Sequence, residues 1–217
     1  MLAGVFVDAF RFIPDNASLL LHKTVELAEL AFVAIAIAIV LALPLGLWLG
    51  HKHRGLFLAL GISTVGRALP SIVLIAFAIA ILGIGFWTNT VALVVLAIPP
   101  ILANTYFGVA GVDADVVEAA RGMGLTETQI LMRVELPLGL PLIITGLKIA
   151  AVFVIATAPI AGIVGGGGLG DIIANEQAYG LAGVLAASYC VAALALLTGF
   201  ALGWAQRAAS RRMAAST

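Results

Sequence analysis

The residues best suited to chemistry in this chain lie in one polar segment, residues 113–137, which reads DADVVEAARGMGLTETQILMRVELP. Seven of its 25 residues carry charge, whereas the 45 residues before it, 68–112, carry none. A chain that keeps one short charged segment between long apolar ones presents that segment to water. The chain offers no Ser/His/Asp set that would indicate a nucleophile, so the chemistry predicted here is polar recognition of a soluble partner. The charged residues are Asp113, Asp115, Glu118, Arg121, Glu127, Arg133 and Glu135.

The first part of the segment predicts a short helix. Asp115 followed three residues later by Glu118 resembles a capping box, which marks a helix start. Gly122 and Gly124 supply a flexible stop, because glycine readily adopts the backbone conformation of a C-terminal cap. Glu118 and Arg121, three residues apart, can pair on the helix surface, and such a pair contributes about 0.2–0.5 kcal/mol.

The second part predicts another short helix. Thr126 followed by Gln129 is a helix start of the same kind. Pro137 is predicted to end this helix, because its ring and its missing N–H cannot continue it. Ala119 and Ala120 keep the first helix slim. A slim, capped helix pair suits insertion into a groove on a partner protein.

These residues resemble the cytoplasmic signature loop of ABC importer permeases. Glu-Ala-Ala at 118–120, glycine at 124 and Leu-Pro at 136–137 fall at that family's spacing at once, and Val134 stands where isoleucine is commoner. In the family this loop forms the coupling helix that docks into the ATP-hydrolysing subunit. The resemblance therefore implies an ATPase-coupling role for Glu118, Ala119, Ala120, Gly124, Leu136 and Pro137.

The composition independently predicts an integral membrane protein. Of 217 residues, 63% are hydrophobic and 10% are charged, whereas soluble domains carry about 25% charged residues. The net charge is zero, so the composition shows no excess of positive charge that would indicate nucleic-acid binding. The single cysteine, Cys190, excludes an internal disulfide. Apolar runs near the length that spans a bilayer predict an all-α protein with five transmembrane helices, at about 31–50, 68–86, 91–112, 138–164 and 181–204, with 56–66 as an interfacial lead-in.

The distribution of lysine and arginine predicts the orientation, because cytoplasmic loops carry an excess of both. One side would hold Lys52, Arg54, Arg121, Arg133 and the arginines of the tail, and the other only Arg11 and Lys23. The polar segment and the C-terminus are therefore expected in the cytoplasm, with the N-terminus outside. We expect an extracytoplasmic segment at 1–19 without the pattern of a cleavable signal peptide, one transmembrane domain at 20–205 and a cytoplasmic tail at 206–217.

Two other motifs have structural interpretations. Gly165, Gly167 and Gly170 fit the spacing of a dinucleotide-binding loop, but that loop follows a strand inside a βαβ unit, and here the glycines follow an apolar span. His51 and His53 lie in a basic cluster with no further metal ligands nearby in the sequence. They are interpreted as polar residues of a cytoplasmic loop, and no metal site is expected.

The five predicted spans hold no Asp or Glu, which disfavours a proton- or sodium-coupled carrier because such carriers place carboxylates inside the membrane. Substrate passage would rely on neutral groups, and Pro99-Pro100 predicts a break or bend in the third span. Each neutral group is equally suited to joining helices by hydrogen bonds. The candidate pathway or gate residues are Asn104, Tyr106, Thr157, Pro159, Gly167 and Gly170.

Further segments resemble the glycine betaine/carnitine/choline branch of the ABC permeases. They are Ala68-Leu69-Pro70-Ser71, Leu82-Gly83-Ile84-Gly85-Phe86, Asn104-Thr105-Tyr106 and Gly167-Gly168-Leu169-Gly170-Asp171. The resemblance implies the type I permease fold in a bacterial inner membrane and import of these osmoprotectants. It also implies a cytoplasmic ABC ATPase, a second permease subunit that is a copy or a relative, and an extracytoplasmic substrate-binding protein.

The chain itself is not expected to be an enzyme. It contains no G-x-x-x-x-G-K-[ST] phosphate loop, so ATP and Mg²⁺ would be used by the partner ATPase, and no cofactor is expected on this chain. Two alternatives remain at this stage. One is a methionine-type ABC permease of similar length. The other is a stand-alone channel or secondary carrier, which would work without an ATPase.

Overall fold

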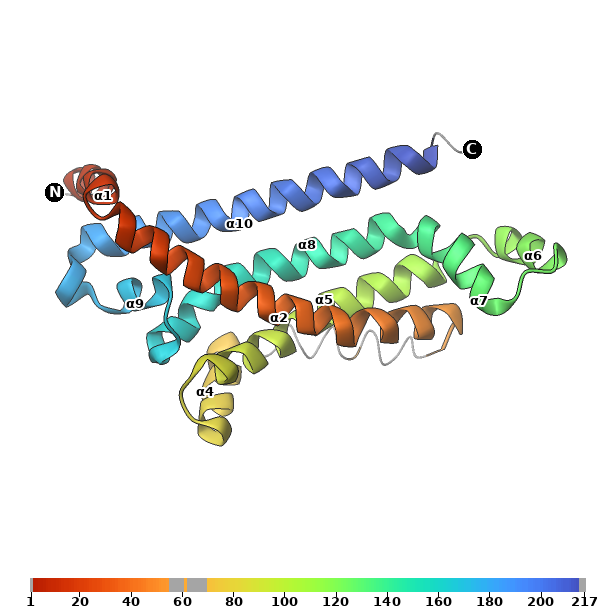
Figure 1. Cartoon of the computed structure of the whole chain (residues 1–217), viewed down its shortest axis with the longest axis horizontal. Coiled ribbons are helices and arrows are strands. Elements are labelled where there is room, and N and C mark those ends of the chain that lie inside the picture. The colour runs from red at the N-terminus through yellow and green to blue at the C-terminus, as the bar shows by residue number, and fades with distance from the viewer. Residues whose placement is uncertain (1, 55–60, 62–69, 215–217) are drawn as a thin grey trace.

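The protein consists of long α-helices laid side by side along one axis (Figure 1). The computed structural model describes residues 2–54, 61 and 70–214. Within these residues, four helices are long and apolar enough to cross a membrane. They comprise α2 (Ala17–His51), α5 (Phe86–Ala110), the helix that continues into α8 (Leu136–Ala161), and α10 (Glu176–Ala214). These helices match four of the five predicted spans.

The second predicted span is not found as one long helix in the described part of the chain. α4 (Ser71–Leu82) has 12 residues, which is about 18 Å at 1.5 Å per residue and shorter than the roughly 30 Å hydrocarbon core. Pro70 precedes α4, and Gly83 ends it at φ 78°. The predicted start of this span at 68–69 and nearly all of the predicted lead-in at 56–66 lie outside the described residues.

α5 is the most deeply buried of the four long helices and packs between α2 and α8. Glycines let the backbones approach closely, as is common between membrane helices. A Cβ atom on Gly46 of α2 would lie 2.7 Å from Cβ of Thr105, and one on Gly139 of α8 would lie 2.6 Å from the Gly108 carbonyl oxygen. α5 is one continuous helix through Pro99-Pro100, so of the predicted break or bend, the break does not occur.

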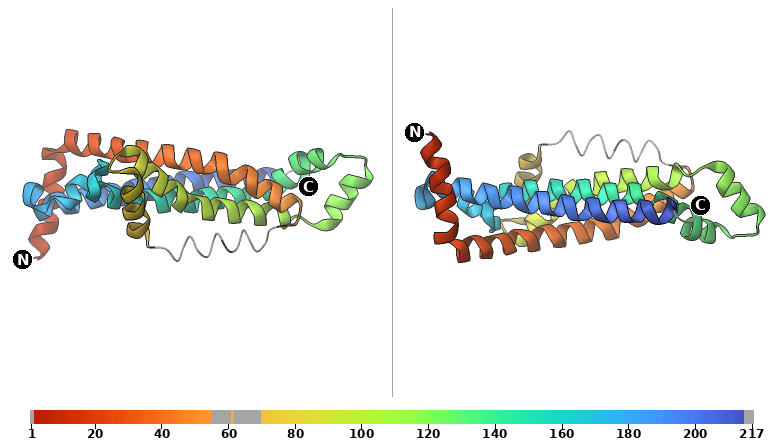
Figure 2. Two further views of the ribbon diagram at one scale, coloured as in Figure 1. Left: turned by 90° about the horizontal axis from the view of Figure 1, so that it is seen from below. Right: turned by 90° about the horizontal axis from the view of Figure 1, so that it is seen from above.

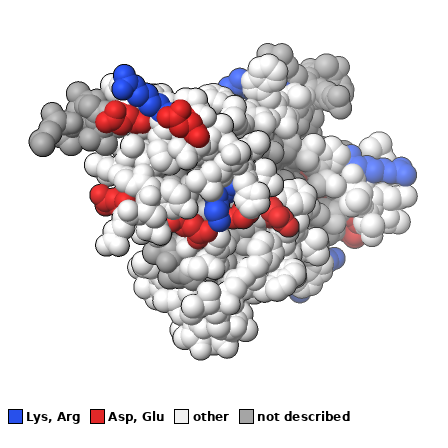
Figure 3. Space-filling view, turned by 60° about the vertical axis from the view of Figure 1, so that its left-hand side comes forward, with Lys and Arg blue, Asp and Glu red and all other residues white. Residues whose placement is uncertain are grey.

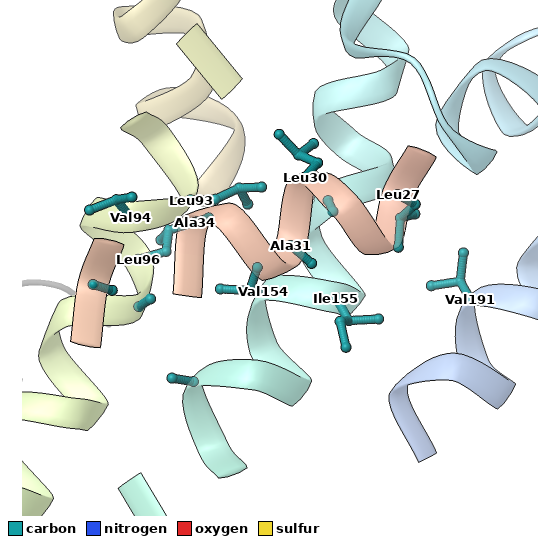
Figure 4. Packing of buried hydrophobic residues seen from close by; sticks show 14 of the residues in the cluster. Leu27, Leu30, Ala31, Ala34, Leu93, Val94, Leu96, Val154, Ile155 and Val191 are labelled. Carbon is teal, nitrogen blue, oxygen red and sulfur yellow. The ribbon is translucent and has the colours of Figure 1, made fainter. Parts of the chain in front are cut away.

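One apolar core joins all four long helices. Figure 4 shows α2 at its centre, with side chains of α5, α8 and α10 around it. Removing such side chains from water is the main stabilising contribution to packing in an aqueous protein; between lipid-exposed helices, close van der Waals contact takes that role. The core side chains labelled in Figure 4 are Leu27, Leu30, Ala31, Ala34, Leu93, Val94, Leu96, Val154, Ile155 and Val191.

The two ends of the bundle differ. At one end, called here the α9 end, lie the N-terminus, α1 (Leu2–Asp15), the π-helix η2 (Gly162–Gly166) and α9 (Leu169–Ala174) (Figure 1). α1 crosses this end at a steep angle to the long helices (Figure 2), and its Phe10 stacks on Tyr189 of α10 with ring centroids 5.5 Å apart. At the other end, called the α6 end, lie α6 (Ala114–Gly122) and α7 (Glu127–Ile130).

Several predicted boundaries shift. α2 begins at Ala17, fourteen residues before the predicted start of the first span at Ala31. α8 ends at Ala161, and the chain continues as the π-helix η2, so the fourth span ends earlier as an α-helix than predicted. α10 starts at Glu176, has a non-helical kink at Gly180, and continues through residues 206–214, which were predicted to be a tail.

Candidate functional site

The polar segment forms two short helices beyond the α6 end of the bundle, as predicted (Figure 1). α6 is capped by Asp113, whose side chain accepts a hydrogen bond from the backbone N–H of Asp115 at 2.9 Å. The predicted start at Asp115 with Glu118 is therefore wrong, because the carboxylate two residues earlier already caps the helix. Gly124 ends the turn at φ 85°, in the left-handed region that favours glycine.

α7 begins with the predicted capping box. The backbone N–H of Gln129 donates to Oγ1 of Thr126 at 3.4 Å, and the backbone N–H of Thr126 donates to Oε1 of Gln129 at 2.9 Å. Two of the backbone donors at the start of the helix are thereby satisfied.

Pro137 does not end the second helix, contrary to the prediction. Leu131–Glu135 form a π-helix, η1, and the backbone N–H of Leu136 donates to the carbonyl oxygen of Leu131, five residues back. Pro137 then lies in the first turn of α8, where a missing N–H and a fixed φ are tolerated. The chain is thus helical from Glu127 to Ala161.

The signature residues divide into exposed and buried ones. On α6, Glu118 and Ala119 are exposed, whereas Ala120 is 2% exposed. Gly124 and Pro137 are exposed, and Leu136 is half-buried. α6 therefore has one face that packs against the protein and one that is open to a soluble partner.

The predicted pair between Glu118 and Arg121 does not form. Arg121 instead reaches across the turn to Glu127, with Nε donating to Oε1 at 3.0 Å and Nη2 donating to Oε2 at 3.4 Å. The planar guanidinium suits a carboxylate that it can bind with two parallel hydrogen bonds. The hydrogen bond with Glu127 raises the pKa of Arg121 above its ordinary value. This contact ties α6 to α7.

Two residues at this end with nearly buried side chains were not among the predicted site residues. His51, the last residue of α2, places Nδ1 2.6 Å from Oε2 of Glu135 and Nε2 3.2 Å from Oε2 of Glu127. Glu135 is 1% exposed. Its position, as an acidic residue among the apolar residues that start a span, is the sequence signal that could have found it. His51 was wrongly interpreted as a polar residue of a loop.

The glycine-rich segment at the α9 end is held to α2 by ionic contacts. Nζ of Lys23 donates to Oδ2 of Asp171 at 2.7 Å and to Oε2 of Glu26 at 3.0 Å, and the backbone N–H of Gly168 donates to the same oxygen of Glu26 at 2.8 Å. We call these four residues the Lys23 clamp. Figure 3 looks toward this end and shows acidic side chains beside a few basic ones on a largely uncharged surface.

Three of the predicted pathway residues lie together at the α9 end. A Cβ atom on Gly162 would lie 2.5 Å from Cα of Gly170 and 2.7 Å from the carbonyl oxygen of Gly167, and Gly170 packs against the carbonyl oxygen of Pro159. Only glycine fits a contact this close. This cluster joins the end of α8 to α9.

The other three predicted pathway residues are not part of that cluster. Asn104 donates from Nδ2 to the carbonyl oxygen of Pro100 at 2.8 Å and packs against Gly146 of α8. Tyr106 is buried, with its ring edge-to-face against Phe107 at a centroid distance of 5.3 Å, and Thr157 is buried on α8. Asn104 and Tyr106 therefore take part in helix packing in this structure.

The described residues contain neither of the other site types considered. Gly165, Gly167 and Gly170 follow α8 within a helical chain, and no strand occurs in residues 2–54, 61 or 70–214 to form a βαβ unit. No group of three or more His, Cys, Asp or Glu side chains that could hold a metal ion is found among the same residues.

Comparison with known proteins identifies the family. A model of the family described as "Binding-protein-dependent transport system inner membrane component" matches residues 34–215. The chain belongs to this family. The carnitine transport permease protein OpuCB of Listeria monocytogenes is 37% identical over 193 residues, which cover 88% of each chain. The choline transport system permease protein OpuBB of Bacillus subtilis is 34% identical over 198 residues, which cover 91% of each chain.

Solved structures support the same fold for this inner membrane component. A structure described as an inward facing conformation of the MetNI methionine ABC transporter matches with a TM-score of 0.74 and 28% identity, covering 89% of this chain and 97% of the other. A second crystal form of that transporter matches with a TM-score of 0.76 and 26% identity. The all-helical type I permease fold predicted from the signature residues is therefore confirmed.

Proposed function

We propose that this chain is the membrane-spanning permease subunit of an ATP-driven importer of osmoprotectants of the glycine betaine, carnitine and choline class. The observation that carries the substrate class is the likeness along 75–91% of the chain to relatives named for carnitine and choline transport. These relatives are 33–37% identical, whereas the methionine transporter structures are 26–28% identical. The methionine-type alternative is therefore disfavoured.

In this proposal the α6 end faces the cytoplasm and α6 is the helix that docks on the ATPase. Two arguments support the orientation: the excess of lysine and arginine in the sequence at this end, and the signature residues of α6. The N-terminus, α1 and α9 then face outside, where a substrate-binding protein delivers the substrate. A second permease subunit completes the pathway in the inner membrane of a bacterium.

In this scheme the chain contributes to transport by changing conformation and not by catalysing a reaction. ATP and Mg²⁺ bind to the partner ATPase, and this chain binds neither. Closure of the ATPase displaces α6, and the helices shift the pathway between inward-open and outward-open states. Such a shift requires that the nucleotide favours one state by differential affinity. Glu118, Ala119 and Gly124, which are exposed, would make the contact, with Ala120, Leu136 and Pro137 supporting it.

The test is uptake in cells that lack their own osmoprotectant transporters. They would express this chain with the ATPase and binding-protein genes of its source, and labelled glycine betaine, choline, carnitine and methionine would be supplied in turn. A parallel strain would carry the ATPase without its catalytic carboxylate. We expect uptake of at least one quaternary amine, and loss of that uptake with the inactive ATPase.

Each other outcome has a defined meaning. Uptake of methionine alone would keep the importer and overturn the substrate class. Uptake that persists with the inactive ATPase would overturn the ATP-driven mechanism and favour a stand-alone channel or secondary carrier. Absence of uptake of all four compounds would contradict the proposed function.

A further inference from the structure

A continuous series of polar contacts at the α6 end links four elements. Arg121 on α6 bonds to Glu127 on α7, Glu127 lies against His51 at the end of α2, and His51 bonds to Glu135 in η1. We call Arg121, Glu127, His51 and Glu135 the four-residue network. Its members come from sequence positions up to 84 residues apart, so it is a product of the fold.

Burial increases along the network. The side chains of Arg121 and Glu127 are 53% and 50% exposed, whereas those of His51 and Glu135 are 7% and 2% exposed. The network therefore starts at the solvent face beside α6 and ends inside the packed helices. A displacement of α6 acts on its exposed members first, and the buried members adjoin the helices that span the membrane.

His51 occupies the position where the network branches. A carboxylate oxygen lies beside each of its ring nitrogens, at 2.6 Å for Glu135 and 3.2 Å for Glu127. The two carboxylates therefore hold the ring from two sides. A buried carboxylate requires a hydrogen-bonding partner, and among the described residues His51 is the side chain that bonds to Glu135.

The chain connectivity shows why this contact matters. α7, η1 and α8 are joined by the backbone, so a displaced α7 acts directly on α8. α2 has no such link, since 75 residues separate His51 from Glu127 in the sequence. Among the described residues, the polar contacts that attach α2 to the loop are those of His51. A loss of these contacts would leave α8 connected to the loop and α2 without its polar connection.

We propose that His51 is a positioning residue that connects the coupling loop to α2, so that the ends of α2 and α8 move together when a partner displaces α6. This inference rests on the proposed function. It predicts that His51 and Glu135 act as one unit in converting ATP hydrolysis into transport, although neither residue contacts substrate or nucleotide.

The test uses the whole transporter reconstituted in liposomes, with the number of substrate molecules imported per ATP hydrolysed as the readout. His51→Ala, Glu135→Ala and the double variant would be compared with the parent protein. Each single variant is expected to lower this ratio by about twofold to thirtyfold, the range in which residues between two coupled sites act. The double variant is expected to be no worse than either single variant, because the two residues share one function.

Two further variants keep the result decisive. His51→Asn places an amide N–H near the position of Nδ1 and so retains one donor for Glu135, and it is expected to give a ratio between those of the parent and His51→Ala. His53→Asn is the matched control, because His53 is an exposed histidine two residues away with φ 49°, which asparagine also adopts. It is expected to leave the ratio unchanged. Co-purification of the ATPase checks that each variant assembles.

The proposal is overturned if assembled His51→Ala keeps the parent ratio, or if the effects of the two single variants multiply in the double variant. It is also overturned if none of the His51 variants assembles, since the contact would then serve the fold alone. These results differ from a failure of the proposed function, in which the parent protein itself would show no ATP-driven import.

Discussion

Glu118 and Glu135 are two acidic residues of the same polar segment in opposite environments. Glu118 is exposed on α6, and within the described residues no hydrogen bond or ion pair involves it directly. Glu135 is buried and bonds to His51. A carboxylate left free at the surface is available to a partner, whereas a buried and paired one holds the protein's own elements together. The two residues therefore serve the coupling loop in different ways.

Replacing Glu118 with lysine should weaken the ATPase contact without affecting the fold. Because Glu118 is exposed, we expect the free energy of unfolding of the Glu118→Lys variant to lie within about 0.5 kcal/mol of that of the parent protein. We expect less ATPase to co-purify with it and uptake to fall. Glu29→Lys makes the same change of charge at an exposed position at the α9 end and serves as the control. Normal ATPase binding and uptake in the Glu118→Lys variant would contradict a coupling role for Glu118.

Local rules of sequence predicted several elements because those elements depend on neighbouring residues. The capping box of Thr126 and Gln129 and the turn at Gly124 are of this kind. The same approach gave a wrong prediction for Pro137, which does not end a helix, because the π-helix before it places it in the first turn of α8. The partner of Arg121 and the burial of Glu135 depend on how α7 and α2 pack, which no short stretch of sequence specifies.

Span prediction had a comparable limit. Four long apolar helices were found because length and hydropathy are sufficient for them. α4 is as apolar as a span but ends after 12 residues, because Gly83 adopts a positive φ that stops the helix. A hydropathy pattern does not distinguish a glycine that stops a helix from a glycine within one, such as Gly46 or Gly139.

The turn between α6 and α7 should respond differently to alanine at its two glycines. Gly124 has φ 85° and no atom within 4 Å of a built Cβ, so Gly124→Ala adds backbone strain of about 1–2 kcal/mol without a clash. Gly122 is helical and equally open, so Gly122→Ala should stabilise α6 by up to about 1 kcal/mol. Hydrogen exchange of the α6 amides should be faster in the first variant and slower in the second. Equal exchange in both would contradict the strained conformation of Gly124.

The packing of α5 on α8 should depend on Gly139. A Cβ atom there would lie 2.6 Å from the Gly108 carbonyl oxygen, which is backbone and can give way only if the helices separate. Overpacking of this kind typically costs about 1–3 kcal/mol, so Gly139→Ala should lower the melting temperature by several degrees in detergent. Gly203→Ala is the control, because a Cβ atom on Gly203 would have Nζ of Lys148 as its nearest contact, at 3.6 Å. Equal melting of the two variants would show that the helices separate more easily than the structure indicates.

At the scale of the whole molecule, α2 connects the two ends. It carries Lys23 of the Lys23 clamp near one end and His51 of the four-residue network at the other. These residues are 28 positions apart, which is about 42 Å along an α-helix. α2 is one continuous helix between these two residues. A displacement of the loop at the α6 end is therefore expected to move α2 and, through it, to act on the Lys23 clamp.

The Lys23 clamp should favour the conformation observed here over one with the α9 end opened. The matching transporter structures are described as inward facing, so under the proposed function the opposite state requires this end to open and Lys23 to release Asp171. Lys23→Met removes both of its ion pairs. The pair with Glu26 lies within α2, so only the pair with Asp171 resists opening. Because an ion pair with partial exposure contributes about 0.2–1 kcal/mol, its loss should shift the population toward the opened state by about 1.4- to 5-fold. ATP hydrolysis without the binding protein should rise by the same factor.

Arg11→Met is the control, since it removes one positive charge from an exposed position at the same end, and it should leave hydrolysis unchanged. Hydrolysis that stays level or falls in Lys23→Met would mean that the clamp does not separate during the cycle, and the α9 end would then have to open elsewhere.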